Sequence, residues 1–327
     1  MSNDEKNNIN VSLKKPISEI LKHIFVNQLL FLIVIMVIIG VIVTIVNPKF
    51  LSVQNLFNIV LQVSVTGIIC VGVAMILITG EFDLSVGPQI SILGLVMAIM
   101  VTRYSIFLTI VVVILLGMAI GAISGFFVTR IKAHSFIITL ALATIYKGAA
   151  LLISGGRYLP LQGRFKFFVG RLFNIIPYPT IVFVIVLIAA FVTFKYLKFG
   201  RLLFAIGGNV QASYLSGVKV RLYKTLVYSI AGGLYGLAAI VLISQISVAY
   251  PTTGDPYTLT ALAAVVVGGI ALSGGKGSAL GIFLGVVVFG LISNSMVIMN
   301  INPFWREVVL GFIILLSVTI SGLASKD

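Results

Sequence analysis

The chain has very few residues suited to redox or metal chemistry. It contains one cysteine, Cys70, and two histidines, His23 and His134, among 327 residues. A single cysteine inside an apolar run cannot form an internal disulfide and lacks the partners of a structural zinc site. The two histidines lack the i, i+4 spacing of a metal-binding helix. We therefore expect no metal site, no cofactor and no catalytic residue in this chain.

Charged residues are also scarce, at 9% of the chain, whereas 60% of the residues are hydrophobic. A soluble domain carries about 25% charged and about 45–50% apolar residues, so this composition predicts an integral membrane protein without a large soluble domain. The net charge of +14 is compatible with nucleic-acid binding in principle. However, the basic residues lie between hydrophobic runs instead of forming a stripe with interleaved aromatics, so we expect no nucleic-acid partner.

The apolar residues fall into long runs, each close to the roughly 20 residues that a membrane-spanning helix needs. These runs predict an all-α polytopic membrane protein with about ten transmembrane helices, over residues 29–46, 56–79, 88–102, 106–128, 135–153, 180–197, 225–244, 259–273, 278–299 and 304–322. The run at 259–273 is short, which predicts a broken helix or an earlier start. Residues 1–28 are polar, no cleavage site follows the first run, and residues 323–327 form a short tail.

Lysine and arginine positions predict the orientation in a membrane. With the N-terminus in the cytoplasm, the inner side collects 14 of these residues and the outer side seven, with Lys147 left inside a helix. This bias predicts that both termini are cytoplasmic. Four of the outer seven lie in residues 154–178, and we treat this loop as a candidate contact surface.

Glycines recur at every fourth position in three runs, the spacing that lets membrane helices approach closely. The runs are Gly117, Gly121 and Gly125; Gly277, Gly281 and Gly285; and Gly232 with Gly236. Packing within one subunit is the favoured interpretation, and a dimer seam along one of the runs remains open.

The longest predicted cytoplasmic loop, residues 198–224, contains a short helix between two breakers. Gly207 and Gly208 break the chain, Asn209 suits an N-cap, and Gly217 suits a left-handed stop after about two turns. Such a helix is unstable alone in water and must pack on something. It is either an interfacial helix or a docking helix for a cytoplasmic motor.

Two irregular segments flank predicted helices and carry polar side chains. Residues 80–88, on the predicted cytoplasmic side, include Glu81, Asp83 and Ser85, of which Asp83 or Ser85 is placed to cap the next helix. The predicted outer segment 244–260 includes Gln245, Asp255 and Tyr257. Irregular backbone at membrane depth is tolerated where it lines a cavity, so the second segment is a candidate pathway lining; it is otherwise an ordinary external loop. In the first segment capping is the favoured interpretation, and Glu81, which is not needed for capping, is expected to form an ionic contact to another chain or helix.

An energy source within the chain is missing. Residues 273–278 fail the phosphate-loop pattern and predict a tight turn between helices. Ion coupling normally needs ionisable groups near the bilayer centre. Lys147 is the one clear case, and snorkelling to the outer boundary explains it more simply. An ion-coupled carrier is therefore disfavoured.

Four segments together resemble the membrane permease subunits of ribose-type ATP-binding-cassette sugar importers. They are residues 78–87 (ITGEFDLSVG), 145–157 (IYKGAALLISGGR), 200–218 (GRLLFAIGGNVQASYLSGV) and 253–281 (TGDPYTLTALAAVVVGGIALSGGKGSALG), and they occur in the family's order. The likeness covers nearly the whole chain after about residue 29. It implies a bacterial plasma-membrane subunit that imports ribose or a related monosaccharide, with a second permease subunit, a cytoplasmic ATPase that binds ATP and Mg, and an extracytoplasmic sugar-binding protein.

The resemblance also implies roles for particular residues. The coupling helix that enters the ATPase would be formed by Gly207, Gly208, Asn209, Val210, Gln211, Ala212, Leu215, Ser216 and Gly217. Asp83 and Ser85 match a family signature that shapes the cytoplasmic end of the pathway. Arg157, Arg164 and Arg171 would dock the binding protein or contact lipid phosphates. The mechanism would be alternating access at a dimer interface; the alternatives are an ion-coupled carrier or facilitator of a small polar solute and, less favoured, an intramembrane enzyme.

Overall fold

The structure is a computed structural model that describes residues 28–173, 176–302, 304–305, 307–309, 311–313 and 315. The helices are α2 (Gln28–Val46), α3 (Val53–Ile78), α4 (Val86–Val101), α5 (Ile106–Arg130), α6 (Ser135–Ser154), α7 (Tyr178–Lys195), α8 (Lys198–Gly208), α9 (Val210–Leu215), α10 (Val220–Ile246), α11 (Asp255–Val267) and α12 (Ala279–Ile298). Short 3-10 helices and strands complete the elements: η1 (Pro48–Leu51), η2 (Lys166–Val169), β1 (Leu159–Pro160), β2 (Arg171–Leu172), β3 (Ile176–Pro177) and β4 (Val248–Ala249).

The prediction of a polytopic helical membrane protein is confirmed. Within the described residues, seven helices are long and apolar enough to cross a membrane: α2, α3, α5, α6, α7, α10 and α12. Two further apolar helices, α4 and α11, have 16 and 13 residues and are shorter than a full span. The tenth predicted run, 304–322, lies largely outside the described residues, as do the tail 323–327 and all but Gln28 of the N-terminal segment.

The two short helices begin where their N-termini meet inside the bundle. The Gly87 N–H donates to the Thr258 hydroxyl at 3.0 Å, and the Gly254 N–H donates to the Ser91 hydroxyl at 3.0 Å. A Cβ on Gly254 would lie 2.0 Å from the Gly87 carbonyl oxygen. The close approach therefore requires glycine at this contact. The expectation that the 259–273 run is a broken or earlier-starting helix is confirmed, since α11 starts at Asp255.

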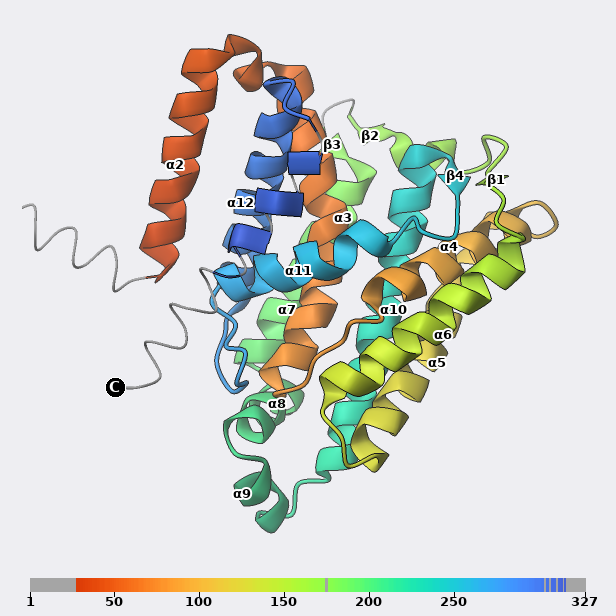
Figure 1. The fold of residues 1–327 in the computed structure, drawn as a ribbon, viewed down its shortest axis with the longest axis vertical. Coiled ribbons are helices and arrows are strands. Elements are labelled where there is room, and N and C mark those ends of the chain that lie inside the picture. The colour runs from red at the N-terminus through yellow and green to blue at the C-terminus, as the bar shows by residue number, and fades with distance from the viewer. Residues whose placement is uncertain are drawn as a thin grey trace, which may run out of the picture.

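The same order of elements occurs twice in opposite directions. A long helix, an irregular segment, a short helix and another long helix follow one another as α3, residues 79–85, α4 and α5, and again as α10, residues 247–254, α11 and α12. In Figure 1 the chain enters α3 at the upper end of the bundle and α10 at the lower end. The arrangement is that of an inverted repeat with discontinuous helices, which places polar backbone at the repeat interface.

Glycine contacts bring helices close together within this subunit, both between the two repeats and within the second repeat. A Cβ on Gly117 would lie 2.3 Å from the Gly232 carbonyl oxygen, and one on Gly121 would lie 2.1 Å from the Tyr228 carbonyl oxygen. Similarly, Gly285 on α12 faces the carbonyl of Ala264 on α11. The favoured interpretation of intrasubunit packing is therefore confirmed for these positions. Gly277 lies outside the helix, in the turn before α12 with φ +153°.

The predicted outer loop carries short strands that the sequence pattern did not indicate. β1 pairs antiparallel with β4, which joins residues 159–160 to the segment that follows α10. β2 pairs antiparallel with β3 just before α7. The β1–β4 pair ties the loop before α7 to the upper end of the bundle (Figure 1), whereas β2 and β3 both belong to the loop.

Candidate functional site

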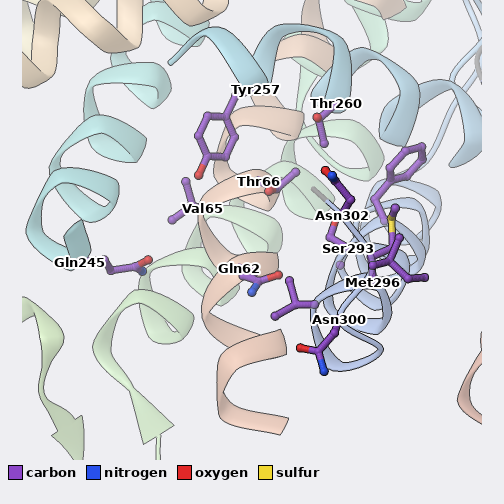
Figure 2. Close-up of a pocket in the computed structure, with 14 residues that line it drawn as sticks. Gln62, Val65, Thr66, Gln245, Tyr257, Thr260, Ser293, Met296, Asn300 and Asn302 are labelled. Carbon is purple, nitrogen blue, oxygen red and sulfur yellow. The ribbon is translucent and has the colours of Figure 1, made fainter. Parts of the chain in front are cut away.

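A cavity of about 480 Å³ lies between α3, α11, α12 and the end of α10 (Figure 2). Eight of its 14 lining residues have polar but uncharged side chains: Gln62, Thr66, Gln245, Tyr257, Thr260, Ser293, Asn300 and Asn302. Apolar side chains, including Val65, Phe289 and Met296, complete it. Among the residues described, the lining contains no charged side chain.

Helical spacing brings the polar groups of the cavity together. Gln62 and Thr66 are four residues apart on α3, and Tyr257 and Thr260 are three residues apart in the first turns of α11, so each pair shares a helix face. Gln245 is in the last turn of α10. Figure 2 shows these side chains arranged around one space. Two of the three residues predicted from the outer segment, Gln245 and Tyr257, thus line the same cavity.

One group in the cavity lacks a protein partner. The Gln245 Nε2 atom is buried and has no hydrogen-bond partner among the described residues. Leaving a buried donor unsatisfied costs about 1–3 kcal/mol, so a turn of the Gln245 amide toward a solute in the cavity would relieve this cost. Amides and hydroxyls provide donors and acceptors without charge, and apolar patches match the C–H faces of a solute. The cavity therefore suits a small neutral hydroxylated solute.

Asp255 does not belong to this cavity. Its Oδ2 accepts a hydrogen bond from the Lys147 Nζ at 2.9 Å, which joins α11 to the middle of α6. The Asp255 carboxylate, not the outer boundary, is therefore the partner of the Lys147 ammonium, which corrects the expectation that Lys147 snorkels. The pairing was missed because its partners are 108 residues apart, and local sequence pattern carries no signal for such a contact.

Hydrogen bonds within the segment before α4 and to the first turn of α4 hold this segment in place. Asp83 is buried, and its Oδ1 accepts hydrogen bonds from the Ser85 N–H at 2.8 Å and from the Ser85 hydroxyl. The Gln89 Nε2 donates to the same hydroxyl at 2.8 Å. Ser85 is the N-cap residue of α4 as predicted, but its side chain makes no capping bond because its hydroxyl is engaged by Asp83 and Gln89.

Neighbouring helices anchor this segment from two sides. From α6, the hydroxyls of Ser135 and Thr139 accept hydrogen bonds from the Phe82 and Leu84 N–H groups at 3.0 and 3.1 Å. From α10, the Tyr228 hydroxyl donates to the Phe82 carbonyl at 2.6 Å, and Lys224 forms an ion pair with Glu81. Glu81 is therefore a structural link to α10, where sequence reasoning had expected only an unspecified ionic contact.

The predicted cytoplasmic helix is present. α9 spans Val210–Leu215, the Asn209 Oδ1 accepts a hydrogen bond from the Ala212 N–H at 2.9 Å, and Gly217 has φ +81°. The N-cap and the left-handed stop are both confirmed. Ser216 is the C-cap, and Gln211 and Leu215 are exposed along α9. The helix therefore presents an uncovered face at the lower end of the bundle (Figure 1).

The loop around α9 is more helical than predicted. Residues 198–208 form α8, and Gly207 and Gly208 are its last residues instead of a break. A Cβ on Gly207 would lie 1.8 Å from the Ile78 carbonyl oxygen. The same carbonyl accepts a hydrogen bond from the Gly275 N–H at 2.9 Å, in the tight turn predicted before α12. Gly207 is required because α8 packs directly on the end of α3.

The three outer arginines have different surroundings. Arg157 is exposed after the end of α6. The Arg164 Nη1 donates to the Val101 carbonyl at the end of α4, at 2.9 Å. The Arg171 guanidinium lies 4.2 Å from the centre of the Phe57 ring. Two of the three therefore contribute to holding the outer loop on the bundle.

Comparison with known proteins gives a consistent assignment. A family model described as branched-chain amino acid transport system, permease component, matches residues 55–318. The chain is 36% identical to the ribose import permease protein RbsC of Haemophilus influenzae, over 86% of this chain and 90% of that one. It is 34% identical to the Escherichia coli RbsC, over 88% and 92%, and 30% identical to the E. coli xylose transport system permease protein XylH, over 83% and 86%. No solved structure matches.

Proposed function

Because the chain belongs to the family of permease components of branched-chain amino acid transport systems, we propose that it is the membrane subunit of an ATP-driven importer of ribose or a related monosaccharide. The permease subunit itself is not an enzyme. Relatives named for ribose import and xylose transport match most of its length, and it is a multi-pass protein of the bacterial inner membrane.

The uncharged lining of the cavity is the observation that favours a sugar as the substrate class. A free amino acid has a carboxylate and an ammonium group, and burying either without a counter-charge is unfavourable. The cavity between α3, α10, α11 and α12 offers amides and hydroxyls and no charged side chain among the described residues. It therefore favours a neutral sugar over the amino acids in the family's description.

The finer topology remains part of this proposal. We assign ten membrane crossings. The described α2, α3, α5, α6, α7, α10 and α12 are full spans, α4 and α11 are half-span helices that each complete a crossing together with the irregular segment before it, and the tenth crossing is at residues 304–322. Residues 1–28, 198–224 and 323–327 then lie in the cytoplasm, which agrees with the excess of basic residues on that side.

The transport energy would come from other chains. We propose a second permease subunit, identical or related, a cytoplasmic ATPase that holds ATP and Mg, and an extracytoplasmic sugar-binding protein. The ATPase would receive α9, whose capped ends let it move as one rigid body. The binding protein would dock on the outer loop mainly through Arg157. Arg164 and Arg171 already contact Val101 and Phe57 within the subunit.

Alternating access at the dimer interface would be driven through a mechanical connection between α9 and the segment before α4. A motor that binds one membrane conformation better than the other shifts the population between them. Displacement of α9 would pass into α10, which begins at Val220, and through the Lys224–Glu81 pair into the segment that leads to α4.

The test is uptake by the reconstituted complex. Proteoliposomes that contain the permease, its ATPase and a binding protein loaded with ribose should take up ribose only when Mg-ATP is present on the ATPase side. Parallel reactions with xylose and leucine test the substrate class, and an ATPase variant unable to hydrolyse ATP is the control. Uptake by the permease alone under an ion gradient would contradict the proposal and favour the carrier alternative.

A further inference from the structure

The Lys147–Asp255 ion pair lies on an open face of the bundle. The exposed fractions of the two side chains are 48% and 33%. Thr144, one turn before Lys147 on the same face of α6, is also exposed. Figure 1 shows α6, α4 and α11 together on one side of the molecule. The pair is therefore accessible from outside the subunit, unlike the mostly buried Lys224–Glu81 pair.

The depth of this pair conflicts with contact to lipid. Lys147 is seven residues before Ser154, the outer end of α6, which corresponds to roughly 10 Å along a helix. Asp255 begins α11 next to the contact between Gly254 and Gly87, in the interior of the bundle. Ionised groups at such depth are costly against hydrocarbon and face a cavity or other protein.

The surroundings of the pair resemble those of a solute route. Half-helices that meet in a membrane protein point the positive ends of their dipoles toward polar ligands. Here the N-termini of α4 and α11 meet beside Asp255, and the carboxylate lies in the first turn of α11. Lys147 neutralises this carboxylate, so the pair offers donors and acceptors to hydroxyl groups without net charge.

We infer that the face of α6 with Thr144 and Lys147, together with Asp255 on α11, lines the aqueous route of the solute, and that the ion pair binds solute hydroxyls on their way through. A second copy of the permease subunit faces this surface across the route. This inference rests on the proposed function, since water reaches the face only if two permease subunits enclose a pathway there.

Cysteine accessibility in the assembled transporter tests the inference. The native chain gives a low background because its single cysteine, Cys70, is fully buried. Thr144→Cys probes the face and leaves the ion pair intact. Ile188→Cys on α7 is the matched control, because Ile188 is 57% exposed and, like Thr144, lies ten residues from the outer end of its helix. Lys147→Cys is a second probe of the face.

A charged, membrane-impermeant thiol reagent should label Thr144→Cys at least tenfold faster than Ile188→Cys, and labelling should lower ATP-dependent sugar uptake at least tenfold. Equal labelling rates, or labelled transporter with undiminished uptake, would overturn the inference. Uptake by the unlabelled variant is measured separately. If the unlabelled variant imports sugar but the thiol reagent does not label its Thr144→Cys side chain, the route is refuted and the proposed function is not. If the side chain is labelled but the unlabelled transporter shows no ATP-dependent sugar uptake, the proposed function is refuted.

Discussion

Lys224 on α10 and Glu81 in the segment before α4 form an ion pair in which the side chains are only 11% and 17% exposed. α10 begins at Val220, four residues after Ser216, the C-cap of α9. The cytoplasmic helix and the segment that enters the bundle are therefore connected through one helix and one pair of charges. Any displacement of α9 that tilts α10 acts directly on residues 80–85.

Glu81→Gln should weaken this connection. The substitution leaves Lys224 largely buried without a counter-charge, and breaking such a pair costs about 3 kcal/mol. We expect a lower unfolding temperature in detergent and a higher number of ATP molecules hydrolysed per sugar imported. The exchanged pair Glu81→Lys with Lys224→Glu should recover part of both losses. An unchanged ratio of hydrolysis to import would show that α10 transmits motion by another contact.

Asn209→Ala should impair coupling through α9. The Asn209 side chain caps a helix of six residues, and loss of an N-cap costs about 1 kcal/mol, a large fraction for so short a helix. We expect weaker retention of the ATPase during purification and lower sugar-stimulated hydrolysis. Asn209→Asp keeps a capping oxygen and should behave like the native chain.

The sequence predicted local structure well and long-range contacts poorly. The ends of α9 were predictable because Asn209 and Gly217 act on backbone groups within three residues of themselves. The half-helix at Asp255 was indicated by a run too short to span the bilayer. In contrast, the Lys147–Asp255 pair joins helices 108 residues apart, and the cavity takes its lining from four elements. Only the packing of α3, α10, α11 and α12 brings Gln62, Gln245 and Tyr257 together.

Gly121→Ala should destabilise the contact between α5 and α10. A Cβ at this position would lie 2.1 Å from the Tyr228 carbonyl oxygen, so the two backbones must separate. Overpacking of this kind costs about 1–3 kcal/mol, and we expect a clearly lower unfolding temperature in detergent. Gly148→Ala on α6 is the matched control, because a Cβ there has no other atom within 4 Å. If the two variants have the same unfolding temperature, the close approach of α5 and α10 is wrong.

Gln245→Leu should separate function from stability. The Gln245 Nε2 is a buried donor with no partner among the described residues, so removing it relieves a penalty of about 1–3 kcal/mol and should leave the unfolding temperature unchanged or raised. If the amide binds a sugar hydroxyl during transport, the same change should lower ATP-dependent uptake by about tenfold, which corresponds to one lost hydrogen bond of about 1.4 kcal/mol.

Met296→Leu is the control for Gln245→Leu, because it alters an apolar part of the same cavity at nearly constant volume. Uptake and unfolding temperature should both stay close to the native values in this variant. A Gln245→Leu transporter with native uptake would mean that the cavity does not bind the solute. A variant that loses stability together with uptake would mean instead that Gln245 supports the fold, and that its buried amide has a partner in the assembled transporter.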